Sequence, residues 1–152
     1  MKKRGICLLP DERYLSELNA PGKLNRTNLG ECAVIQRFLS THPNENLAIL
    51  TPYRNQRALL ADTAKKCGYP QEVSLTVHRA QGREWDAVLF SVVDTTGKFF
   101  ITTLNPQNCG TQISNPAVSR AKKRLILVCD CNDWGDQPKK PIGQLSQVAQ
   151  SI

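Results

Sequence analysis

The stretch Thr76-Val-His-Arg-Ala-Gln-Gly-Arg-Glu-Trp-Asp86 decides the fold and the candidate site of this chain. A β-branched apolar run, Val73–Val77, leads into this polar loop, and the loop closes on a second apolar run, Ala87–Val93. The loop brings backbone amides, an arginine, a carboxylate and an amide side chain together. These polar groups are rarely needed in a buried core, whereas a phosphate or sugar ligand requires such groups for binding.

Outward from this loop, apolar runs of strand length alternate with helical patterns along the chain. Continuous apolar strands that alternate with helices predict an α/β fold, with a mainly parallel sheet and helices on both faces, in three layers. The expected helices are Leu29–Leu39, a second from Pro52 to a glycine cap at Gly68, and a short one from Asn115. The expected strands are Ile6–Leu9, Leu47–Leu50, Val73–Val77, Ala87–Val93 and Leu125–Cys129.

With 152 residues, the chain fits one domain. Residues 1–28 are expected to be an N-terminal strand and connector of that domain, and residues 29–134 its core. Residues 94–114 carry few core side chains and are expected to form a long loop. After Trp134 the chain is rich in Gln, Ser and Pro, so residues 135–152 are expected to be a polar tail or linker.

The composition is that of an ordinary globular protein, with 40% hydrophobic and 22% charged residues. No apolar stretch reaches about 18 residues, so we expect no membrane span and no membrane partner. Only four apolar residues precede Pro10, too few for a signal peptide, and we therefore expect a cytoplasmic protein. The net charge of +7 favours a polyanionic partner such as nucleic acid.

The six cysteines have no spacing typical of a metal site. The chain contains no C-x-x-C pair, and both histidines are remote in sequence from the one close pair, Cys129 and Cys131. We therefore expect reduced, buried thiols and no bound metal.

Open α/β sheets bind ligands at the carboxyl ends of their strands, and three junctions in the sequence suggest such a site. The first is Thr51-Pro-Tyr-Arg-Asn-Gln56. Thr51 suits an N-cap and Pro52 a first helical residue, which puts Tyr53 and Arg54 in a first turn that favours anions. The alternative is that these residues only start a helix.

The second junction is the loop quoted above. Gly82 permits positive φ or a close backbone approach, Arg83 offers a donor fork for phosphate, and Glu84 can accept from ribose hydroxyls. Thr76 and His78 lie where the strand ends and can donate to a nucleic-acid phosphate. The alternative is an arginine–carboxylate pair that staples a surface turn. Trp85 either stacks on another group or packs into the core.

The third junction is the short helix that Asn115 and Pro116 begin. Ser119 and Arg120 lie about one turn into it, near strand ends. An arginine on a rigid helix there can act as an arginine finger on a transferring γ-phosphate, with a rate effect of about 10³–10⁵. The alternative is that residues 122–124 form a solvated basic face, and we expect this for Lys123 and Arg124.

Two boxes in this order, Gln81-Gly-Arg-Glu84 and Arg120-Ala-Lys122, resemble motifs V and VI of the second, C-terminal RecA-like domain of a superfamily 1 helicase of AAA type. The Thr51-Pro-Tyr-x-x-Gln56 segment is similar to one in the same family, and the resemblance spans residues 29–130. Pro116 and Ser119 depart from the family pattern, which has an aliphatic residue and a threonine there.

The resemblance implies a domain that shares an ATP site with a first RecA-like domain and steps along single-stranded DNA or RNA. The residues it implies for ATP binding are Gln81, Gly82, Arg83, Glu84 and Arg120, with Arg120 as the catalytic arginine. The residues it implies for nucleic-acid binding are Thr51, Tyr53, Thr76 and His78. ATP and Mg²⁺ are the implied cofactors, and the first domain is the implied partner, in cis or in trans.

The chain itself contains no G-x-x-x-x-G-K-[ST] phosphate loop. In the family, the first domain supplies that loop, the magnesium-binding acidic motif and the catalytic carboxylate, and a Gln-Tyr-Arg box usually opens the second domain. The chain therefore looks like half of a helicase and is not expected to hydrolyse ATP alone. The alternative function is a catalytically inactive RecA-like module that binds nucleic acid or protein. A small kinase is disfavoured because it needs its own phosphate loop.

Overall fold

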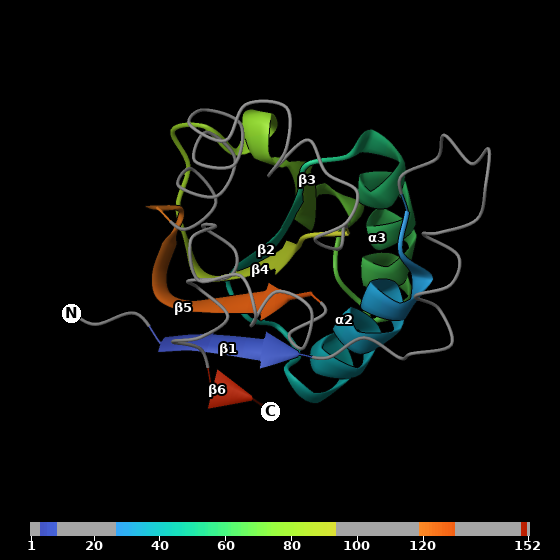
Figure 1. Cartoon of the computed structure of the whole chain (residues 1–152), viewed down its shortest axis with the longest axis horizontal. Coiled ribbons are helices and arrows are strands. Elements are labelled where there is room, and N and C mark those ends of the chain that lie inside the picture. Colours follow the sequence, from blue (N-terminus) through green and yellow to red (C-terminus); the bar gives the residue numbers. More distant parts are fainter. Residues whose placement is uncertain (1–3, 9–26, 94–118, 130–149, 152) are drawn as a thin grey trace.

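The structure, a computed structural model, describes residues 4–8, 27–93, 119–129 and 150–151. These residues form a six-stranded sheet in the order β3-β2-β4-β5-β1-β6, in which every neighbouring pair is parallel (Figure 1). The predicted α/β fold with a parallel sheet is confirmed. The strands are β1 Arg4–Leu8, β2 Leu47–Thr51, β3 Ser74–Thr76, β4 Trp85–Ser91, β5 Ala121–Val128 and β6 Gln150–Ser151.

Both described α-helices, α2 (Leu29–Thr41) and α3 (Arg54–Lys66), cover the same face of the sheet (Figure 1). Alternate residues of β2 divide between the two faces. Leu47 and Ile49 pack with the helices, whereas Ala48 and Leu50 pack on the opposite side. On that opposite side, the described cover is the 3₁₀ helix η2 (Val77–Ala80).

Helix α2 begins where the sequence predicts and ends two residues later than expected, at Thr41. Asn28 is its N-cap, and the Asn28 side chain accepts a hydrogen bond from the Glu31 amide (3.1 Å). The buried face of the helix consists of Cys32, Val34, Ile35, Phe38 and Leu39.

Helix α3 starts later than the sequence suggests. Its N-cap is Tyr53, which makes no side-chain capping bond, and Arg54 is the first helical residue. Thr51 belongs to strand β2, so the prediction of Thr51 as N-cap and Pro52 as first helical residue is wrong. The helix ends at Lys66, and Gly68 follows with a φ of 83°, the conformation expected of a glycine just beyond a helix.

Several strand boundaries differ from the predicted ones. The run Val73–Val77 was expected to be one strand, but only Ser74–Thr76 is extended, between η1 (Gln71–Val73) and η2. Apolar residues alone do not distinguish a strand from a 3₁₀ turn. Conversely, β5 begins at Ala121 and includes three charged residues, because pairing with β4 needs only backbone groups.

Several predictions fall outside the described residues: the connector up to residue 26, the loop 94–114, residues 115–118 of the short helix, and most of the segment 135–152. Gln150–Ser151, in the expected polar tail, form strand β6 beside β1. In the part of the chain that the structure describes, no helix is both long and apolar enough to cross a membrane.

A buried polar network lies where β4 ends. Both oxygens of the Glu31 carboxylate accept hydrogen bonds from the Val93 amide, at 3.0 and 3.1 Å. Ser91 Oγ (2.6 Å) and Asn28 Nδ2 (3.0 Å) also donate to this carboxylate. Val93 has a φ of 69°, which is rare and strained for a β-branched residue. Glu31, itself only 1% exposed, thus holds the chain in an unfavourable conformation as it leaves the sheet.

Gln56 joins the first turns of α3 to this network. Its Oε1 accepts from the Asn28 amide (2.8 Å), and its Nε2 donates to the Asn28 carbonyl (3.1 Å). The same Nε2 also donates to Ser91 Oγ (3.1 Å). Because Gln56 is fully buried, these bonds fix the amino end of α3 against α2 and β4.

Cys32 is a buried free thiol and Cys67 a half-buried one. Cys129 is buried as well. Burial raises the pKa of the Cys32 thiol from 9.0 to about 12, and the charge of Glu31 adds to the effect. Near pH 8 the thiolate fraction is therefore about a thousandfold lower than that of an unshifted thiol.

We expect Cys32 to be alkylated by iodoacetamide far more slowly than Cys67 at pH 8, because the thiolate is the reacting species. The expected ratio of rates is at least about a hundredfold, since the thiolate fraction falls by a factor near a thousand. Peptide mapping after timed alkylation measures both sites in one sample. Equal rates would show that Cys32 is not buried in solution.

Candidate functional site

Residues 76–86 run from the side of the sheet where its parallel strands have their carboxyl ends (the carboxyl edge) to the side where they have their amino ends (the amino edge). Thr76 ends β3 at the carboxyl edge, and Trp85 begins β4 at the amino edge of the same parallel sheet. Between them, Val77 and Ala80 of η2 are buried against the face opposite the α-helices. The candidate residues therefore separate into two groups on opposite edges.

The expectation that the residues of all three junctions lie at carboxyl ends is thus wrong for Gln81–Glu84 and for Arg120. Gln81–Glu84 and Arg120 precede β4 and β5, so they lie at the amino ends of these strands. Thr76 and His78 remain at the carboxyl edge, where the sequence placed them.

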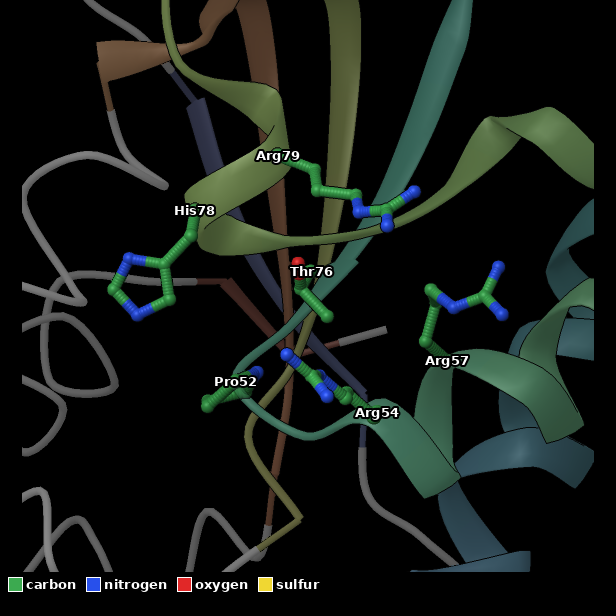
Figure 2. A pocket seen from close by; sticks show the side chains of 6 residues that line it. All are labelled: Pro52, Arg54, Arg57, Thr76, His78 and Arg79. Atoms are coloured by element: carbon green, nitrogen blue, oxygen red, sulfur yellow. The ribbon is translucent and has the colours of Figure 1, made fainter.

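At the carboxyl edge, a cleft of about 380 Å³ lies between the amino end of α3 and η2 (Figure 2). Of the four residues expected to contact nucleic acid, Thr76 and His78 line it. Tyr53 is the half-buried N-cap of α3, beside the cleft. Thr51 is fully buried, and its hydroxyl accepts a long hydrogen bond from the Tyr53 amide (3.5 Å), so it shapes the turn. The lining residues are Pro52, Arg54, Arg57, Thr76, His78 and Arg79.

The cleft is strongly cationic. Three arginines line it, and its described lining contains no acidic side chain. The first turn of α3 has no acidic residue either, so the positive end of the helix dipole adds to the positive charge of the arginines. This combination favours an anionic ligand.

Thr76 adds a hydroxyl to this cleft. The residue is nine-tenths buried, at 9% exposure, and its side chain makes no hydrogen bond within the described ranges. A hydroxyl in such a position can donate to a ligand oxygen. Nearby, Ser74 Oγ donates to the Arg57 carbonyl (2.8 Å), which ties α3 to β3 and fixes the two walls of the cleft.

Sequence reasoning noted Arg54 but missed Arg57 and Arg79 as lining residues. Arg57 follows Arg54 by three residues, a spacing that puts both side chains on one side of a helix. That spacing could have identified Arg57. Nothing in the sequence indicated that η2 folds back so that Arg79 reaches the same cleft.

At the amino edge, Arg83, Trp85 and Arg120 lie close together. The Trp85 amide donates to the Arg120 carbonyl (2.9 Å), and the Arg83 guanidinium carbon lies 4.8 Å from the centre of a Trp85 ring. Trp85 therefore both stacks under an arginine and packs against the core. Arg83 makes no ion pair with any described carboxylate, so the proposed staple of a surface turn is not observed there.

Two details of this edge bear on a nucleotide. Gly82 has a φ of 78°, and nothing lies within 4 Å of the position that a Cβ would occupy. The positive φ therefore favours glycine at this position, and the missing Cβ leaves open space beside the backbone. The Nε of Arg120 is buried without a hydrogen-bond partner among the described residues.

The basic residues after Arg120 behave as a surface face. Lys122 is exposed, and Lys123 lies 3.8 Å from Asp86. Arg124 forms a shorter ion pair with Glu45, at 2.6 Å. Exposed pairs of this kind contribute about 0–1 kcal/mol each. The expectation of a solvated basic face agrees with the exposure of Lys123, whereas Arg124 is only partly exposed and is paired with Glu45.

Comparison with known proteins adds two likenesses. The family described as AAA domain matches residues 12–132 of the chain. The chain is also 31% identical over 88 residues to the DNA polymerase alpha-associated DNA helicase A of Schizosaccharomyces pombe. That alignment covers 58% of this chain but only 13% of the relative.

Proposed function

Because this chain belongs to the AAA domain family and is a helicase-like, RecA-type domain, we propose that it is the C-terminal motor domain of an ATP-dependent superfamily 1 helicase or translocase. In this proposal it binds a single strand of DNA or RNA at the carboxyl edge of its sheet. At the amino edge it completes an ATP site with a first RecA-like domain, present in cis or in trans.

The course of residues 76–86 is the observation that carries the proposal. One continuous segment begins in the cationic cleft at Thr76 and ends beside Arg120 at Trp85. A motor must couple its grip on the strand to the state of its nucleotide. A short segment with one end at each site, packed on the core through η2, can transmit a shift from one edge to the other.

The proposed ATP contacts lie at the amino edge. The Gly82 backbone approaches the nucleotide closely, Glu84 accepts from its hydroxyls, and Gln81 and Arg83 flank it. Arg120 neutralises charge that develops on the γ-phosphate during its transfer. Mg²⁺ is assigned to the first domain, as the helicase resemblance implies, and the described residues of this chain hold no cluster of metal-ligating side chains.

The proposed strand contacts lie in and beside the cleft. Thr76 and His78 donate to backbone phosphates, Tyr53 flanks the strand, and Thr51 acts by holding the turn that presents Tyr53. The amino end of α3, whose first turn holds no acidic residue, adds a fixed positive potential.

We expect Thr76→Val to weaken binding of the chain to a fluorescent oligo(dT) about tenfold in an anisotropy titration. The change removes one hydroxyl with little change in volume, and a hydrogen bond to a charged acceptor contributes about 1.5 kcal/mol or more. Thr63→Val is the matched control, because Thr63 is equally buried on α3 but donates to the Leu59 carbonyl (2.9 Å), away from the cleft. If both variants bound like the unaltered chain, Thr76 would not contact the strand.

A further inference from the structure

We propose that Arg57 and Arg79 clamp successive phosphates of a single nucleic-acid strand from opposite walls of the cleft, which grips the backbone without reading the bases. This inference rests on the proposed strand binding. It adds two residues that the helicase resemblance did not identify, and it states how the strand is recognised.

The two arginines come from different elements. Arg57 lies on α3, and its backbone is tied to β3 through Ser74. Arg79 lies on η2, three residues after Thr76. Figure 2 shows both side chains extending to the same side of Thr76, with Arg54 below them. A ligand in the cleft would therefore meet guanidinium groups from two walls, with the Thr76 hydroxyl to one side of them.

The charges of these arginines are not neutralised by the described residues. Neither Arg57 nor Arg79 forms an ion pair there. Arg57 also borders a shallow neighbouring hollow with Asp62 and Glu72, yet it pairs with neither carboxylate. With three arginines and no acidic residue in its described lining, the cleft favours an anionic ligand, and a ligand with several negative charges can contact more than one guanidinium group.

The chemistry of the lining indicates phosphate rather than base recognition. A planar guanidinium matches phosphate oxygens with two parallel hydrogen bonds. The ring of His78 in the lining and that of Tyr53 beside the cleft can stack on bases, but such stacking tolerates any base and does not read the sequence. Amide and carboxylate side chains, which read base edges, are absent from the described lining.

The test measures how the affinity of the full chain for a fluorescent oligo(dT) depends on KCl concentration. Each phosphate that a cation neutralises on a single strand contributes about −0.7 to the slope of log K against log salt. We expect Arg57→Gln and Arg79→Gln each to flatten the slope by about 0.7, and the double variant to flatten it by about twice that amount. Arg57→Lys keeps the charge and should keep the slope.

Arg37→Gln is the matched control. Arg37 is exposed on α2, in the half of that helix that leads to the amino end of β2, and its loss changes the net charge by the same amount. It should leave the slope unchanged. If Arg37→Gln flattened the slope as much as the cleft variants, a general charge effect would replace the clamp.

The remaining outcomes separate the clamp from the proposed function. If Thr76→Val weakened binding but both arginine variants kept the original slope, the clamp would be wrong and strand binding would stand. If the unaltered chain bound no strand even at low salt, strand binding itself would fail. A preference above about tenfold for oligo(dA) or oligo(dT) over the other would overturn recognition by phosphates alone, because stacking on a side chain contributes about 1–3 kcal/mol per base.

Discussion

Replacing Arg120 by alanine is expected to lower ATP turnover about a thousandfold in an assembly of this chain with a first RecA-like domain. The reason is electrostatic. Charge that develops on the γ-phosphate oxygens loses its guanidinium partner, and arginine fingers contribute about 10³–10⁵ in rate. Arg120 suits this role because the Trp85 amide fixes its backbone carbonyl (2.9 Å) at the amino edge, and because its buried Nε has no hydrogen-bond partner among the described residues.

The measurement is a steady-state ATPase assay in the presence of oligo(dT), with strand binding measured in parallel. Lys122→Ala is the control. Lys122 is exposed two residues further along, and its substitution removes the same charge. Strand affinity should survive in both variants, since the cleft lies at the opposite edge of the sheet. A turnover within threefold of the original in Arg120→Ala would instead favour the catalytically inactive binding module.

The sequence predicts structural features that depend on neighbouring residues better than features that depend on contacts between residues far apart in the chain. The parallel α/β sheet follows from apolar runs separated by helical patterns, and local rules also identify the start of α2 at Leu29 and the glycine at Gly68. Thr76 and His78 are found at a strand end as expected. These features depend on residues that are close together in the sequence.

The features that sequence reasoning missed depend on where η2 turns. Because Val77–Ala80 form a 3₁₀ turn and not strand, the chain folds over the face of the sheet before β4 begins. That path puts Arg79 in the cleft and Gln81–Glu84 at the other edge. The sequence predicts a polar loop after Val77 but not the path of that loop over the sheet, so the division of the site into two edges could not be predicted.

The buried polar network around Glu31 also could not be predicted from local sequence patterns. Glu31 lies in the first turn of a helix, where an acidic residue is explained by the helix dipole alone. Its bonds to the Val93 amide, 62 residues away, depend on tertiary structure that no local pattern announces. The positive φ of Val93 is equally unexpected, because β-branched residues avoid it.

Replacing Glu31 by alanine is expected to lower the free energy of unfolding by about 3–5 kcal/mol, as when one partner of a buried charged network is removed. The loss would leave the Val93 amide, Ser91 Oγ and Asn28 Nδ2 without this acceptor. Each buried donor left unsatisfied costs about 1–3 kcal/mol. Val93 would also lose the bonds that hold its strained backbone.

Urea unfolding followed by circular dichroism measures this change, and Glu45→Ala is its control. Glu45→Ala removes the same charge, but Glu45 belongs to a half-exposed ion pair with Arg124. The free energy of unfolding should therefore fall by only about 1 kcal/mol or less. Equal effects of the two substitutions would mean that water reaches the end of β4 and satisfies the network. A large effect of Glu31→Ala alone would show that this end of the sheet is held by Glu31. Since Gln56 links the same network to α3, a fixed network also explains how the walls of the cationic cleft keep their places.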